Sequence, residues 1–144
     1  MDINRTPELW AQLEQDDITI REACGNTVRN VTASETAGID VKERFDVSPY
    51  AHALFQYFLR NPISQEMGRK FKVSFSASDD DTGLSYMHDL GFIAKIENGV
   101  RGFKVLLGGG LGSQPRHADV IYSFLPTDKI IPLMEGVVRV FDRY

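Results

Sequence analysis

Three segments of the chain repeat apolar side chains at the three- and four-residue spacing of an amphipathic helix. The first covers residues 7–15 and the last covers residues 127–144. The middle helix is predicted to begin at Ser48 and Pro49, with the serine as its cap and the proline in its first turn. It ends before Pro62, because proline lacks the N–H that a helix interior needs. The last helix is still periodic at the final residue, which predicts a chain cut from a longer protein.

Four further segments have the composition and alternation of β-strands. They cover residues 27–32, 70–76, 92–96 and 102–107. In the second of these, phenylalanine and valine point to one face, and lysine and serine point to the other. A turn at Asn98 and Gly99 joins the last two strands as a hairpin. With the helices, these strands predict an α+β fold, in which a mixed sheet of about five strands has helices packed on one face.

The composition fits one domain with a hydrophobic core. Hydrophobic residues make up 42% of the 144 residues, charged residues make up 25%, and the net charge is −4. A negative chain is not built for nucleic acid or for an anionic membrane, and no apolar run reaches the roughly 20 residues that a bilayer span requires. Residues 1–17 lack the apolar stretch of a signal peptide, so we expect a cytoplasmic protein.

The most informative local feature is the basic start of the strand at residues 70–76. On a strand, Lys70 and Lys72 point to the same face about 7 Å apart, and like charges this close repel unless an anion lies between them. Ser74 and Ser76 extend that face with hydroxyl donors. This pattern is typical of an anion receptor, although a solvated sheet face with extended lysine side chains gives the same pattern.

Two other segments offer groups for an anion. Arg29 lies within the strand at residues 27–32, where a guanidinium needs either an oxyanion or an internal salt bridge. The glycine run at residues 108–110 follows an apolar strand, and it either exposes backbone N–H groups to a ligand or forms a plain turn. The run completes neither a dinucleotide fingerprint nor a P-loop. Arg116 and His117 follow it and would add positive charge.

No metal site is predicted. His52, His88 and His117 lack the spacing of metal ligands, and the three aspartates at residues 79–81 predict a solvated acidic turn rather than a calcium loop. Cys24 is the only cysteine. One thiol cannot form an internal disulfide, and it cannot hold an iron–sulfur cluster, which normally needs four cysteine ligands.

Four of these segments, taken in order, resemble the sulfite and nitrite reductase hemoprotein family. They read GNTVRNV at residues 25–31, RKFKV at 69–73, DLGFIA at 89–94 and GFKVLLGGGL at 102–111. The first resembles the opening of the family's sirohaem-binding domain, the second its substrate-lysine strand, and the last two the strands and glycine loop that follow. The likeness covers roughly residues 18–144.

The resemblance implies roles for particular residues. Those that match the family residues on the distal side of sirohaem, in contact with the bound anion, are Arg29, Lys70 and Lys72. Those that fall where the family contacts the macrocycle or its carboxylates are Asn26, Asn30, Arg69, Gly108, Gly109 and Gly110. Arg116 and His117 join this cofactor-binding set by charge and position alone.

The resemblance also implies an organisation. A truncated sirohaem-binding domain would occupy residues 18–144, after an N-terminal helical extension at residues 1–17. The parent protein would reduce an oxyanion at sirohaem coupled to a 4Fe–4S cluster, with electrons from ferredoxin or a similar donor. Family members are several times longer and bind the cluster through four cysteines that this chain lacks. We therefore expect a fragment from the first part of the domain, inactive by itself and without bound cofactor.

Lys72 bears on the identity of the substrate. Nitrite reductases of the family tend to have asparagine where this chain has Lys72, and sulfite can carry two negative charges where nitrite carries one. Two lysines therefore favour sulfite, and we predict an assimilatory-type sulfite reductase that forms sulfide. The alternatives are a nitrite reductase of the same family, a non-catalytic module with phosphate or nucleotide on the glycine loop, and an interaction domain whose basic strand binds an acidic partner.

Overall fold

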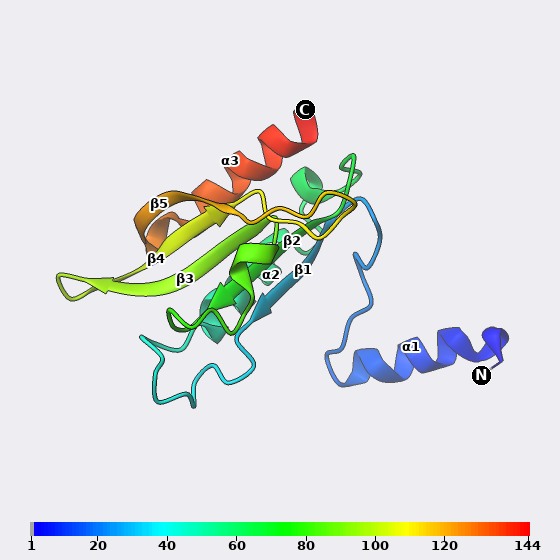
Figure 1. Cartoon of the computed structure of the whole chain (residues 1–144). Helices are drawn as coiled ribbons and strands as arrows, with labels where there is room; N and C mark the ends of the chain where they lie inside the picture. Colours follow the sequence, from blue (N-terminus) through cyan, green and yellow to red (C-terminus); the bar gives the residue numbers. More distant parts are fainter. Residues whose placement is uncertain (1) are drawn as a thin grey trace.

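Five strands form one mixed sheet in the order β1-β2-β3-β4-β5 (Figure 1). The computed structural model describes residues 2–144. The strands are β1 (Val28–Ala33), β2 (Phe71–Ser76), β3 (Leu90–Glu97), β4 (Val100–Leu107) and β5 (Asp119–Pro126). The helices are α1 (Thr6–Gln15), α2 (Ser48–Phe58) and α3 (Ile130–Arg143), with short 3-10 turns η1 (Ile3–Arg5), η2 (Pro62–Ser64), η3 (Ser85–Met87) and η4 (Thr127–Lys129).

The sheet is parallel on one side and antiparallel on the other. Strands β1, β2 and β3 run parallel, with Val73 of β2 opposite Leu90 of β3. Strands β3, β4 and β5 run antiparallel, and a tight turn at Asn98 and Gly99 joins the first two of these strands. Both turn residues have positive φ, as the turns that close two-residue hairpins require. The predicted α+β fold with a mixed sheet is confirmed.

One face of the sheet carries the main hydrophobic core. The alternation predicted for β2 places Phe71, Val73 and Phe75 on this face, and each is at most 2% exposed. Buried side chains of α2 and α3 pack against them, so both helices lie on the same side of the sheet, as predicted (Figure 1). Burying each such phenylalanine stabilises the fold by roughly 1.5–3 kcal/mol.

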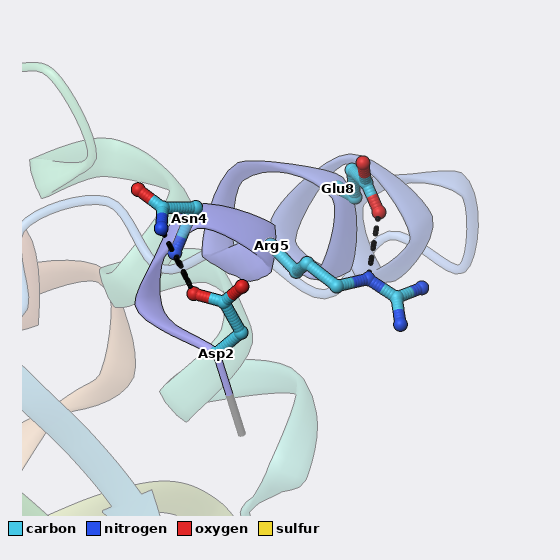
Figure 2. Close-up of polar contacts among 4 residues, drawn as sticks. All are labelled: Asp2, Asn4, Arg5 and Glu8. Carbon is cyan, nitrogen blue, oxygen red and sulfur yellow. Dashed lines mark hydrogen bonds and ion pairs between the residues drawn. The ribbon is translucent and has the colours of Figure 1, made fainter.

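Helix α1 stands apart from the sheet (Figure 1) and buries none of its residues. Its start is held by local contacts, which Figure 2 shows. The Asp2 carboxylate accepts the Asn4 N–H at 3.0 Å, and Arg5 pairs with Glu8 at 3.2 Å. The apolar side chains that predicted this helix remain partly exposed, with Trp10 at 45%.

The ends of the elements differ from the prediction in three places. Ser48 is the first residue of α2 rather than its cap, and the Asp46 carboxylate accepts the Ser48 N–H at 2.9 Å. The last helix begins at Ile130 after the η4 turn, and Pro132 sits in its first turn, where no N–H is needed. Lys70 precedes β2 instead of starting it.

Candidate anion-binding site

A cavity of about 540 Å³ opens where β2 begins and β4 ends. Its charged lining consists of Arg69, Lys70, Lys72, Arg116 and one carboxylate, Asp89. The glycine loop after β4 forms the opposite wall, and its lining residues are Gly108, Gly109, Gly110 and Gly112. Four cations against one carboxylate make this a positively charged hollow in a chain whose net charge is −4. Such a hollow attracts small anions.

The cations on the β2 side are not neutralised by salt bridges. Within residues 2–144, Arg69, Lys70 and Lys72 pair with no carboxylate, whereas Lys42 pairs with Asp80 at 2.8 Å elsewhere on the surface. Lys70 and Lys72 are half-buried, so their charges are less screened by water than those of fully exposed lysines. Close like charges of this kind are stabilised by an anion between them.

Arg116 enters the cavity from the glycine loop. Its guanidinium pairs with Asp119 at 2.5 Å, and both side chains are largely exposed. An exposed pair of this kind is worth at most about 1 kcal/mol, so an anionic ligand can compete with Asp119 for the guanidinium.

The N–H groups of Gly108, Gly109 and Gly110 face the protein, which favours the plain turn over the alternative in which they are offered to a ligand. Gly108 donates to the Asp89 carbonyl at 2.9 Å, Gly109 to the His88 carbonyl at 3.1 Å, and Gly110 to the Arg116 carbonyl at 2.9 Å. The run allows close packing instead. A Cβ on Gly109 would lie 2.5 Å from a backbone oxygen of η3. The glycines therefore shape the wall of the cavity and do not supply its donors.

The serine hydroxyls of β2 are wrongly predicted as part of the anion-binding face. Ser74 and Ser76 do point away from the core face, but both are fully buried. The Ser74 hydroxyl donates to the Gly83 carbonyl, and the Ser76 hydroxyl donates to the Asp81 carboxylate at 2.5 Å. The turn after β2 folds back over this face, so the open part of the strand is restricted to its lysine end.

The predicted residues on β1 and just before it are not in the lining of the cavity. Arg29 is exposed at an irregularity in the pairing of β1 with β2, and Asn30 stands opposite Lys72. Asn26 is exposed, and its carbonyl accepts the Met67 N–H at 2.8 Å. The predicted alternative for Arg29, an internal salt bridge, is not formed within residues 2–144. The roles of these three residues stay predictions.

His117 lies outside the cavity, although its neighbour Arg116 lines it. The imidazole stacks on the ring of Tyr86, with centroids 4.5 Å apart. The Tyr86 hydroxyl accepts a hydrogen bond from Lys104 at 3.1 Å. This cluster covers the sheet face opposite the helices.

An apolar groove, missed in the sequence, adjoins the charged cavity. It has a volume of about 580 Å³ and is lined mainly by β2, β4 and α3, through Phe71, Leu107, Leu133, Val137 and Phe141 among others. The groove and the cavity share Asp89, Gly108 and Phe141. The combined hollow therefore has an apolar part and a cationic part.

The groups with shifted pKa values lie away from this site. A hydrogen bond and the charge of Asp80 raise the pKa of Lys42. A hydrogen bond to Glu135 raises the pKa of Tyr57 and links α2 to α3. The part of the chain that the structure describes contains no group of three or more residues suited to hold a metal ion. None of its helices is long and apolar enough to cross a membrane.

Comparison with known proteins gives the family. Residues 24–144 match the family described as "Nitrite and sulphite reductase 4Fe-4S domain". The chain belongs to this family. The resemblance inferred from the four sequence segments is thereby confirmed.

Relatives of this nitrite and sulphite reductase domain include both kinds of reductase. It is 31% identical to a protein named "Sulfite reductase (ferredoxin) 1" from Mycolicibacterium paratuberculosis, over 99% of this chain and 25% of that protein. It is 29% identical to "Assimilatory ferredoxin-dependent nitrite reductase" from Haloferax mediterranei, over 98% of this chain and 25% of that protein. The chain thus spans about a quarter of the length of these curated relatives.

The fold of this domain also has a solved counterpart. The structure of the Mycobacterium tuberculosis NirA protein superimposes on 97% of this chain with a TM-score of 0.86 and 25% sequence identity, covering 26% of that protein. The family description includes a 4Fe–4S cluster. The residues of this chain do not fit one, because its single cysteine, Cys24, is exposed and has no companion ligands.

Proposed function

We propose that this chain supplies part of the substrate and sirohaem pocket of an assimilatory-type, ferredoxin-dependent sulfite reductase, which reduces sulfite to sulfide. The observation that carries the proposal is the group of unpaired cations, Arg69, Lys70 and Lys72, around a cavity of about 540 Å³. The names of the relatives, which include sulfite and nitrite reductases with ferredoxin as electron donor, support it. In this proposal the domain begins near residue 18, after helix α1.

The lysines would bind the oxyanion and hold protons beside it. Ammonium groups donate charge-assisted hydrogen bonds to oxyanions, and fixed positive charge offsets the negative charge that accumulates during reduction. Lys70 and Lys72 are the proposed donors of protons as sulfur–oxygen bonds break. Arg29, on the strand beside them, is proposed to complete the binding set.

The shape and charge of the combined hollow fit sirohaem. A tetrapyrrole has an apolar ring and several carboxylates, and here an apolar groove adjoins a cationic cavity. Arg69 and Arg116 would hold carboxylates, and the half-buried Phe141 would contact the ring. When bound, this group would carry electrons to the substrate. Asn26, Asn30 and His117 remain proposed contacts with the macrocycle.

Sulfite is the proposed substrate, with nitrite as the alternative. Sulfite can carry two negative charges, and two lysines balance a dianion better than a monoanion. Nitrite remains the second candidate because the relatives include nitrite reductases at similar identity. A phosphate or nucleotide module finds no support, since the N–H groups of Gly108, Gly109 and Gly110 already donate to protein carbonyls.

Binding of sulfite and nitrite to the 144-residue chain, followed by NMR titration, tests the proposal. We expect shifts at Lys70 and Lys72, and Lys70→Ala or Lys72→Ala should each weaken sulfite binding about tenfold, as expected for one charge-assisted hydrogen bond. Lys95→Ala is the matched control, because Lys95 lies towards the far end of β3. Lys72→Asn should lower the ratio of sulfite to nitrite affinity. Equal losses of sulfite affinity in Lys95→Ala and in the Lys72 variants would contradict the assignment of Lys72 to the anion site.

A further inference from the structure

Asp89, the only carboxylate that residues 2–144 contribute to the lining of the charged cavity, joins its two walls. Its Oδ2 accepts the backbone N–H of Lys72 at 2.8 Å. Its own carbonyl oxygen accepts the N–H of Gly108 at 2.9 Å. One residue immediately before β3 therefore fixes both the lysine strand and the start of the glycine loop.

The side chain of Asp89 is needed because the backbone pairing of β2 with β3 begins one residue after Lys72. Phe71 donates its N–H to Thr27, towards β1. The N–H of Lys72 then points towards β3, where the pairing begins only at Val73, opposite the residue that follows Asp89. Without the carboxylate, this half-buried N–H would lose its partner, and the backbone that carries the lysine would be free to move.

The same carboxylate changes the electrostatics of the cavity. It lies among four cations and lowers the positive potential that a bound anion meets. Coulomb energy is proportional to the charge of the guest, so the unfavourable contribution of the carboxylate is twice as large for a dianion as for a monoanion.

We infer that Asp89 is the positioning residue for Lys72 and that its charge limits the preference of the cavity for dianions over monoanions. This inference rests on the proposed function only in its second part, since the hydrogen bond to Lys72 exists whether or not the cavity binds an anion.

Two variants of Asp89 separate the two parts. Asp89→Asn keeps an oxygen that accepts the Lys72 N–H but removes the charge. Asp89→Ala removes both. Amide hydrogen exchange of the full chain should be about tenfold faster at Lys72 in the alanine variant, as loss of one hydrogen bond predicts, and little changed in the asparagine variant. The N–H of Phe71, which donates to Thr27, is the internal control.

Titrations with sulfate and nitrite measure the charge effect. In Asp89→Asn we expect nitrite to bind about threefold more tightly and sulfate about tenfold more tightly. The gain in binding free energy is twice as large for the dianion, so the factor in affinity for sulfate is about the square of that for nitrite. Equal factors for the two anions, or no change, would overturn the electrostatic part. An unchanged exchange rate at Lys72 in Asp89→Ala would overturn the positioning part.

A third variant keeps the test decisive if the alanine variant does not fold by circular dichroism. Asp89→Glu retains the charge but moves the oxygen by one methylene. It should speed amide hydrogen exchange at Lys72 without increasing the affinity for sulfate or nitrite. An exchange rate at Lys72 equal to that of the original chain would count against the positioning role. If the unaltered chain binds neither anion, the proposed function fails, while the exchange rates still decide the role of Asp89.

Discussion

Alanine substitution along the glycine loop tests the packing that shapes the cavity. A Cβ on Gly109 would lie 2.5 Å from the Tyr86 carbonyl oxygen and 2.6 Å from that of His88. Neither backbone atom can rotate away, so the loop must move and the hydrogen bond from Gly109 to His88 must weaken. Overpacking of this kind costs about 1–3 kcal/mol and the lost hydrogen bond about 1 kcal/mol, so we expect Gly109→Ala to destabilise the fold by roughly 2–4 kcal/mol.

The neighbouring glycines provide matched controls. A Cβ on Gly108 meets nothing within 4 Å, but its φ of +88° makes alanine strained by about 1–2 kcal/mol. A Cβ on Gly110 also meets nothing, and its φ is outside the left-handed region, so Gly110→Ala should lie within about 0.5 kcal/mol of the original.

Urea denaturation followed by far-ultraviolet circular dichroism measures this order. The fluorescence of Trp10 is a poor probe, because α1 does not pack against the sheet. With a slope of about 1–3 kcal/mol per molar urea, the midpoint of Gly109→Ala should fall by roughly 1–2 M. A midpoint for Gly109→Ala equal to that for Gly110→Ala would refute the argument that close packing, and not ligand contact, requires glycine there.

Two further predictions concern hydrogen bonds away from the cavity. Tyr57 donates a hydrogen bond to Glu135, and its pKa is raised above the usual value of about 10, so the bond stabilises the fold below pH 10 and is lost as the pH rises through the raised pKa. The difference in unfolding free energy between the original chain and Tyr57→Phe, measured by urea denaturation, should therefore shrink above pH 10. A difference that stays constant with pH would be inconsistent with the bond. Ser76→Ala should cost about 1–3 kcal/mol, because it removes a buried hydroxyl that donates to the half-buried Asp81 carboxylate. Alanine at the exposed Ser123 should change stability little, and similar urea midpoints for the two variants would contradict this prediction.

The sequence predicted those parts of the fold in which hydrophobic alternation determines the structure. The alternation in β2 placed Phe71, Val73 and Phe75 on the core face, because only a buried face requires such regular spacing. Strand β5 was missed, since its pairing with β4 is irregular at two places and Val120 and Tyr122 remain about half exposed. Alternation alone does not reveal an edge strand of this kind.

The candidate site was predicted in its charges but not in its hydrogen bonds. Lys70 and Lys72 are two residues apart in the sequence and line the same cavity, and a local spacing of this kind is visible in a sequence. Which of these groups are covered by later segments depends on the tertiary structure. The turn that buries Ser76 and the carbonyls that accept from Gly108 and Gly109 come from residues 81–89, and no spacing rule connects these residues to the strand. Asp89, although it opens the segment DLGFIA, was given no role in the site for the same reason.

The two walls of the charged cavity lie at the start of β2 and in the loop that follows β4, and these strands are not neighbours, because β3 lies between them. An anion that touches both walls would therefore act as a clamp across three strands. Such a clamp exists only in the folded chain, so saturating anion should raise the melting temperature, and the increase should grow with the logarithm of anion concentration. Binding of the anion and folding of the sheet are in this way thermodynamically coupled.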